Sequence, residues 1–261
     1  MSRSLDLAQS AGAQYADIRV VENRTQSIQV KNGVVESLNF SDSMGFGIRV
    51  LVNGAWGFSS SRELTAEEID RVSEQALEIA RASALVRGEK VDLGPPVSNQ
   101  GKYVTPVTID PFTISVEDRL GVLLAADAEM ARVDGVRVRQ GNLVLIREKK
   151  WFANTESAFT EQTIIETGGG IIATAVGDSE VQTRSYPNSF GRQQETGGWE
   201  MMLLWDLHGN AERIAKVAVE LLTADPCPAD TTTTVIFACD ELSLQVLEYC
   251  GHQIELDRVF G

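Results

Sequence analysis

The residue types best suited to chemistry lie near the end of the chain, in the stretch LQVLEYCGHQIELDRVFG. It contains Glu248 and His252, one of only two histidines in the protein. On an α-helix, a carboxylate and an imidazole four positions apart are neighbours. Hydrolysis of a peptide by a metal ion needs ligands, an open position for water and a carboxylate that removes the water's proton. The pair therefore indicates either part of a metallopeptidase site or, as the simpler alternative, an exposed helix turn.

Nearby residues offer few substitutes for a missing metal ligand. Cys250 and His252 are two positions apart, which on an α-helix separates their directions by about 200°, so both would not reach one ion. Glu255 and Asp257 follow the helix and are expected to orient neighbouring side chains or to bind Arg258. The local pattern thus provides one imidazole and one carboxylate, fewer than the three protein ligands of a catalytic zinc.

The cysteines and the second histidine are predicted to be structural. Cys227, Cys239 and Cys250 have no CxxC spacing and form no even set, which is typical of a reducing compartment. Small buried thiols are the simplest interpretation of all three. Cys239 lies ahead of the predicted helix and would need an unusual approach to a metal. His208, in the stretch WDLHGN, is predicted to be a surface or helix-capping residue.

Composition narrows the class of protein. With 261 residues, of which 43% are hydrophobic, the chain can form one large domain or two ordinary ones. The 37 acidic and 23 basic residues give a net charge of -14, and the basic residues form no dense block, which argues against direct binding of nucleic acid. No segment has the apolar run of about 18 residues that a membrane span requires, and the first residues lack a signal-peptide core. We therefore expect a cytoplasmic protein without a membrane segment.

The first part of the chain predicts a short helix, two hairpins and an amphipathic helix. The first ten residues suggest the short helix, and the next dozen alternate as a strand does. Asn32-Gly33 and Asn53-Gly54 each separate two alternating runs, and this dipeptide favours two-residue hairpin turns. Thr65 with Glu68 is typical of a capping box, and it precedes apolar residues at the helical period.

The middle of the chain predicts a linker, a second amphipathic helix and more strands. Residues 88–106 are typical of a linker, and Ser115 with Asp118 marks the start of the helix. Strands are predicted between residues 136 and 186, with turns at Gly141-Asn142 and at Gly168 to Gly170, for a sheet of about seven strands. The glycine triplet lacks the Lys-Ser/Thr of a phosphate-binding loop, so we assign it no chemistry.

These elements predict an α+β fold, in which an antiparallel sheet packs with two or three helices. The third helix covers residues 210–224 and ends before DPCPADTTTT, whose prolines cannot continue it. That stretch is predicted to be a domain boundary. Beyond it, a short β-branched strand precedes a helix that starts near Asp240, whose side chain can cap the first turn. Glu248 and His252 lie on this last helix.

Five segments in this order resemble the TldD/PmbA family, whose members are also called modulators of DNA gyrase and are regarded as zinc metallopeptidases. They are GAQYADIRVVE, GFGIRVLVNGAWGFSSS, ANTESAFTEQ, PCPADTTTTVIF and LQVLEYCGHQIELDRVFG. The resemblance covers nearly the whole chain. It is closer to the TldD branch, because the PmbA branch is described as lacking the metal-binding motif.

The resemblance implies a role for each motif position. The family motif is His-Glu, three residues and His, and a cysteine from the C-terminal part completes the zinc site. Glu248 falls on the glutamate that acts as general base, and His252 falls on the second metal ligand. The first ligand position is Leu247, and leucine cannot bind zinc. Ser157 is a smaller departure, because the family pattern commonly has glycine in that turn.

The resemblance also implies the domain organisation. Family members are about twice as long as this chain. Residues 1–224 are therefore expected to form the N-terminal α+β domain, and residues 225–261 the truncated start of the C-terminal metallopeptidase domain. Such a segment is expected to leave apolar surface exposed.

Three functions are consistent with these observations. The first is a TldD/PmbA-type metallopeptidase that acts on peptides or unfolded proteins, impaired here by Leu247 and by truncation. The second is a non-catalytic partner subunit or peptide-binding module that forms a homo- or heterodimer with a family member. The third is action on DNA, which the net charge of -14 disfavours because the phosphates would be repelled.

Overall fold

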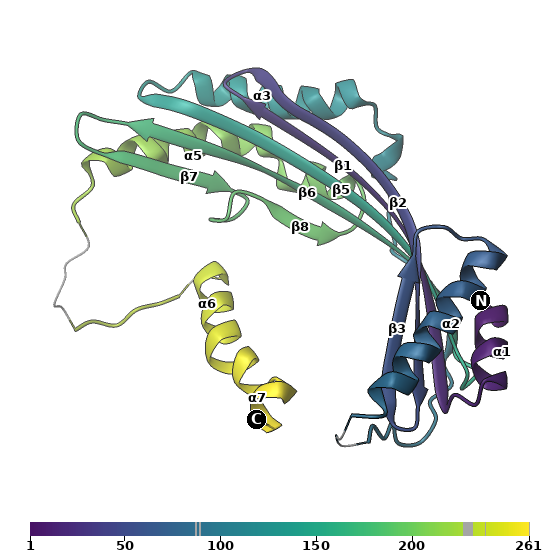
Figure 1. The fold of residues 1–261 in the computed structure, drawn as a ribbon. Helices are drawn as coiled ribbons and strands as arrows, with labels where there is room; N and C mark the ends of the chain where they lie inside the picture. Colours follow the sequence, from purple (N-terminus) through teal and green to yellow (C-terminus); the bar gives the residue numbers. More distant parts are fainter. Residues whose placement is uncertain (87, 89, 227–231, 238, 261) are drawn as a thin grey trace.

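A computed structural model describes residues 1–86, 88, 90–226, 232–237 and 239–260. Its main feature is one sheet of long, curved strands with helices packed against it (Figure 1). The α+β class is thus confirmed. The strands are β1 (Tyr15–Lys31), β2 (Val34–Val52), β3 (Ala55–Ser61), β4 (Gln100–Val104), β5 (Val136–Asn154), β6 (Phe159–Val176), β7 (Val181–Tyr186) and β8 (Gln193–Thr196).

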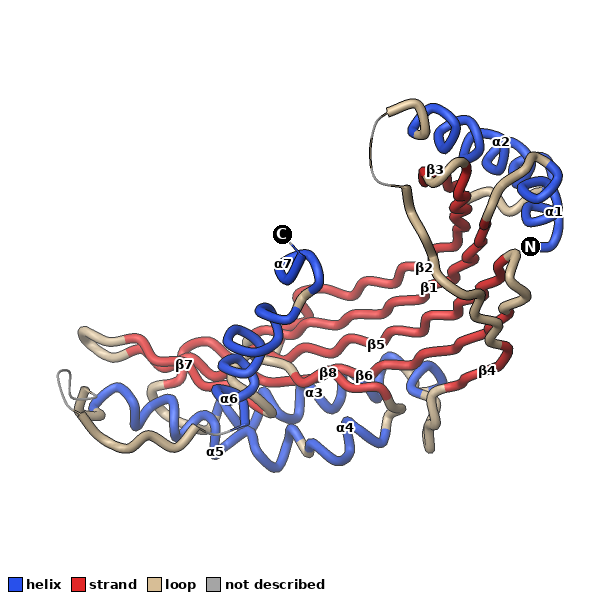
Figure 2. The backbone as a smooth tube through the Cα atoms, turned by 90° about the horizontal axis from the view of Figure 1, so that it is seen from below, coloured by secondary structure: helices blue, strands red, loops and turns tan. Residues whose placement is uncertain are grey.

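The sheet order is β3-β2-β1-β5-β6-β4, and β7 and β8 also pair with β6. β4, β8 and β7 follow one another along the outer edge of β6, opposite its residues 159–163, 166–169 and 171–176. All pairings are antiparallel except that of β4 with β6, which is parallel. β2, β1, β5 and β6 run side by side over most of their length (Figure 2).

Both predicted hairpin turns are confirmed. Asn32 and Gly33 have φ angles of 49° and 76°, and Asn53 and Gly54 have φ angles of 53° and 80°. These left-handed conformations suit two-residue hairpins, whose twist matches that of the flanking strands. Ser157 also has a positive φ of 68°, so it occupies a turn position that favours glycine.

The helices begin where the sequence places their caps. The Thr65 hydroxyl accepts a hydrogen bond from the Glu68 backbone N–H, and the Ser115 hydroxyl accepts one from that of Asp118. Each bond satisfies a donor that the helix itself cannot pair. The helices of this region are α1 (Ser2–Ser10), α2 (Ala66–Ser83), α3 (Val116–Ala131), α4 (Glu200–Trp205) and α5 (Leu207–Glu220), with short 3₁₀ turns η1 (Pro111–Thr113) and η2 (Leu221–Thr223).

Two hydrophobic cores lie on the same face of the sheet, at opposite ends of the long strands. One core contains Ile18 from β1 and Ala153 from β5, and packs against α1 and α2. The other contains Ile28 and Leu143 from the same two strands, and packs against α3, α4 and α5. The buried residues keep the same alternation along each strand, so the curvature of the sheet separates the two cores (Figure 1).

Several predicted elements need correction. Gly141-Asn142 lies within β5 and Gly168 to Gly170 within β6, so neither forms a turn. Two of these glycines leave room for neighbouring segments. A side chain at Gly169 would collide with Met202, and one at Gly170 would collide with the carbonyl oxygen of Gly191. Close approach of these distant segments requires glycine.

Other corrections concern short elements. The predicted linker of residues 88–106 contains β4, which pairs with residues 159–163 of β6. β8 and α4 were not predicted, because each is too short for a clear periodic pattern. The third helix begins at Leu207, three residues earlier than expected, and the Asp206 side chain caps it by accepting from the Gly209 N–H at 3.0 Å. None of the described helices is long and apolar enough to cross a membrane.

Candidate metal centre

Glu248 and His252 lie on the last helical segment, shown in yellow in Figure 1. This segment begins with α6 (Cys239–Val246), continues through the π-helical turn η3 (Leu247–Gly251) and the 3₁₀ turn η4 (His252–Ile254), and ends with α7 (Leu256–Phe260). The predicted helix is therefore confirmed, but its central turn is wider than an α-helix. The side chains of Cys239 and Asp240 and the whole of Cys227 lie outside the described residues, so their predicted roles stay predictions.

The π-helical turn changes the relation between the motif positions. The His252 backbone N–H donates to the Leu247 carbonyl oxygen, five residues earlier. On an α-helix, positions five residues apart differ in direction by about 140°. A π-helical turn is closed by a hydrogen bond between positions i and i+5, which reduces this difference in direction, and such turns are frequent at functional sites. The backbone thus brings positions 247 and 252 toward the same side.

The His252 imidazole lies between two carboxylates. Its Nδ1 is 2.7 Å from Glu255 Oε1, and its Nε2 is 4.0 Å from Glu248 Oε1. When Nδ1–H donates to Glu255, the lone pair of the ring remains on Nε2, the atom that faces Glu248. A carboxylate that holds the far nitrogen of a histidine is the usual support for a metal-binding imidazole.

Glu255 is itself oriented by its neighbours. Its Oε2 lies 3.3 Å from Arg258 Nε, while its Oε1 contacts His252. The expectation that Glu255 orients neighbours and binds Arg258 is confirmed. Asp257 accepts a hydrogen bond from the Arg258 backbone N–H at 3.0 Å, so it contributes to the turn rather than to the histidine.

The described residues do not complete a zinc site by themselves. The Leu247 side chain offers no donor atom. Cys250 is a free thiol and is exposed, so the prediction of a buried thiol is wrong at this position. Within the part of the chain that the structure describes, no three His, Cys, Asp or Glu side chains are grouped so that they could hold a metal ion. A zinc ion bound through His252 would therefore need further ligands from elsewhere.

His208 belongs to another element of the fold. It belongs to the first turn of α5, where its Nε2 is 3.5 Å from Glu129 Oε1 of α3. Its side chain is exposed. The prediction of a surface residue is confirmed, and His208 plays no part in the candidate centre.

Comparison with known proteins identifies the family of the chain. The model of the "PmbA/TldA metallopeptidase domain 1" matches residues 16–80, and that of the "PmbA/TldA metallopeptidase central domain" matches residues 109–224. The first region holds the β1–β3 hairpins and most of α2, and the second holds α3, α4 and α5 with strands β5 to β8. The chain belongs to the TldD/PmbA family.

The chain is also similar in sequence to longer proteins. A metalloprotease of Methanothermobacter thermautotrophicus is 28% identical over 94% of this chain and 51% of the relative, and one of Archaeoglobus fulgidus is 26% identical over 94% and 53%. The chain thus spans about half the length of these relatives.

Solved structures agree with the fold. A Thermotoga maritima protein crystallised under the name of a DNA gyrase modulator gives a TM-score of 0.68 at 18% identity, over 87% of this chain and 49% of that one. TldE from Thermococcus kodakarensis gives 0.59 at 14% identity, over 84% and 47%. At these identities the likeness concerns the fold alone.

Proposed function

We propose that this protein is a TldD/PmbA-type peptidase subunit of the cytoplasm that acts on peptides or unfolded proteins, and that its own metal centre is impaired at Leu247. One observation carries the proposal. The π-helical turn directs position 247 toward the side of His252, and the residue at that position has no donor atom. A catalytic zinc held by three protein ligands would lose one of them here.

The other residues of the candidate centre are suited to roles in a metallopeptidase site. Zinc, when bound in a peptidase, polarises the scissile carbonyl and lowers the pKa of its water. In this chain, Glu248 is suited to accept a proton at Oε1, and Glu255 holds Nδ1 of His252 so that Nε2 is available. Both tasks are consistent with a site descended from an active enzyme.

A specific observation favours a second function, that of a partner subunit in a homo- or heterodimer. Residues 235–237 and the last helical segment expose most of their large apolar side chains, and large exposed apolar surfaces mark interaction sites. Family resemblance makes a related subunit the natural partner. The exposed side chains are Val235, Ile236, Phe237, Leu242, Leu244, Val246, Leu247, Tyr249, Ile254, Leu256, Val259 and Phe260.

Hydrolysis of a quenched fluorescent unfolded casein tests the first proposal. We expect the purified chain with added zinc to give no turnover above a Glu248→Gln variant, because the ligand set is incomplete. Zinc-dependent hydrolysis that Glu248→Gln abolishes would contradict the impairment.

Sedimentation with a family member that has both motif histidines tests the partner function. We expect a mixed complex that Ile236→Ser with Phe237→Ser weakens. Val181→Ser is the matched control, because Val181 is an exposed apolar residue of β7. Separate sedimentation of the two proteins, or equal weakening by the control, would contradict the partner function.

A further inference from the structure

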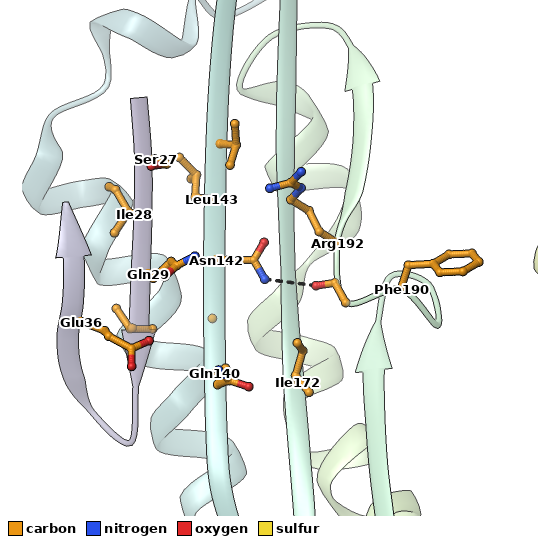
Figure 3. Close-up of a pocket in the computed structure, with 14 residues that line it drawn as sticks. Ser27, Ile28, Gln29, Glu36, Gln140, Asn142, Leu143, Ile172, Phe190 and Arg192 are labelled. Carbon is orange, nitrogen blue, oxygen red and sulfur yellow. Dashed lines mark hydrogen bonds between the residues drawn. The ribbon is translucent and has the colours of Figure 1, made fainter. Parts of the chain in front are cut away.

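The face of the sheet opposite the helices contains a hollow of about 420 Å³. Its floor comes from β1, β5 and β6, through residues such as Ser27, Asn142 and Ile172 (Figure 3). Each of these alternates with a residue buried under the helices, namely Ile28, Leu143 and Ile171. The hollow therefore lies on the opposite side of the sheet from the hydrophobic core.

One wall of the hollow is a braced loop. The Asn142 amide donates to the Gly191 carbonyl oxygen at 3.2 Å, which fixes the loop against β5. Within the loop, the Asn188 amide donates to the Arg192 carbonyl oxygen at 3.0 Å and to Gln193 Oε1 at 2.8 Å. The loop can approach because Gly170 has no side chain, which explains one member of the glycine triplet.

The polar groups of the hollow are mostly uncharged. Ser27, Gln29, Gln140 and Asn142 contribute hydroxyl and amide groups, which can both donate and accept hydrogen bonds. The Asn142 side-chain oxygen is buried and has no hydrogen-bond partner among the described residues. An unpaired buried acceptor is costly unless a donor reaches it, so this position favours a ligand N–H.

Charge distinguishes the two sides of the hollow. Figure 3 shows Asn142 in the middle, with Arg192 on one side and Glu36 on the other. The Arg192 guanidinium makes no ion pair with any described residue, whereas Glu36 lies 3.8 Å from Lys31. A free guanidinium is well matched to a carboxylate, which it can bind through two parallel hydrogen bonds. The carboxylate of Glu36 disfavours a polyanion such as nucleic acid.

We infer that this hollow binds a short extended peptide, with the terminal carboxylate at Arg192 and the peptide N–H and C=O groups on the amide-lined floor. The inference rests on the proposed function for its choice of peptides as the ligand class. Charge complementarity supports this occupant, because a peptide with free ends has a neutral polar middle, a carboxylate for Arg192 and an amine for Glu36. The site combines residues from both matched domains and uses neither Glu248 nor His252.

The test uses the full chain and two probes, Ala-Ser-Ala-Ser with a free carboxylate and the same peptide with a C-terminal carboxamide. Binding is followed by NMR through the Asn142 side-chain amide resonance, assigned with Asn142→Ala, in the presence of a metal chelator. We expect the free acid to shift this resonance and to bind roughly tenfold more tightly than the carboxamide, as one charge-assisted contact predicts.

Arg192→Gln should abolish the preference for the free acid. Arg62→Gln should leave it intact, because Arg62 is also exposed and makes no ion pair with a described residue, but follows β3, at the opposite edge of the sheet from β6. Equal binding of the two peptides, no shift of the Asn142 resonance, or equal loss in both variants would overturn the inference. Because zinc is absent from this assay, failure here is separate from failure of the casein experiment.

Discussion

The sheet region and the last helical segment differ in what holds them in place. In the sheet region, large side chains such as Ile171 are fully buried, and capped helices close both cores. In the last segment, Ile254 is 74% exposed, and the contacts of Glu248, His252, Glu255 and Arg258 with one another are all local. Local hydrogen bonds therefore set the geometry of the candidate centre, whereas tertiary packing sets that of the sheet.

This difference implies that the residues that stabilise the fold are not those of the candidate metal centre. Burial of apolar side chains dominates the free energy of folding, so the sheet region should supply nearly all of it. The segment around His252 can then tolerate substitution with little change in stability. Residues there can accordingly vary without loss of the fold.

The largest expected effect comes from truncating the same residue type in the two regions. Ile171→Ala should lower the free energy of unfolding by about 2–5 kcal/mol, because it leaves a cavity in the core under α5. Ile254→Ala should change it by less than about 0.5 kcal/mol, because the side chain is already exposed. Urea unfolding followed by tryptophan fluorescence measures both, and similar losses would remove the distinction between the regions.

A smaller effect is expected at the glycines of the sheet. Gly170→Ala should lower the free energy of unfolding by about 1–3 kcal/mol, since the new methyl group would meet the Gly191 carbonyl oxygen. Gly101→Ala in β4 is the matched control, because nothing lies within 4 Å of its added methyl group. If both variants unfolded at the wild-type urea concentration, close packing would not explain the triplet.

The smallest effect concerns the capped start of α2. Hydrogen bonds from Arg71 and then from Ser61 lower the pKa of Glu68 from 4.5 to about 2. Because the pKa of Glu68 is lower in the folded state than in the unfolded state, ionisation of this carboxyl group stabilises the folded state. This contribution is present above about pH 4.5 and is lost as the pH falls toward 2.

Carboxyl NMR titration of Glu68 measures this shift. Arg71→Gln should return the pKa toward 4.5, and Arg62→Gln should leave it low. An unchanged titration in Arg71→Gln would rule out the ion pair as the cause.

Local signals predicted the fold well where the controlling contacts are local. The caps at Thr65 and Ser115 and the Asn-Gly turns depend on residues a few positions apart, and all four are confirmed. The prediction of a turn at the glycine triplet is wrong. Glycine is needed there because Met202 and Gly191 pack against the strand, and these residues approach it only in the folded protein.

The candidate site was predicted to a similar extent. Residue types and spacing indicated Glu248 and His252, and the family resemblance indicated the departure at Leu247; the roles of all three stay predictions. The π-helical turn that relates positions 247 and 252 has no signature in the residue pattern, because it is a one-residue change in hydrogen bonding.

Zinc affinity of the full chain tests the central claim, which is that Leu247 is the defect in the metal centre. Competition with a chromophoric chelator is measured for the wild type, for Leu247→His and for Val246→His, which places the new histidine one position away. We predict that Leu247→His binds zinc at least about tenfold more tightly than the other two. Adding His252→Ala to Leu247→His should remove that gain. One tightly bound zinc per wild-type chain, lost in His252→Ala, would contradict the claim and reveal a replacement ligand.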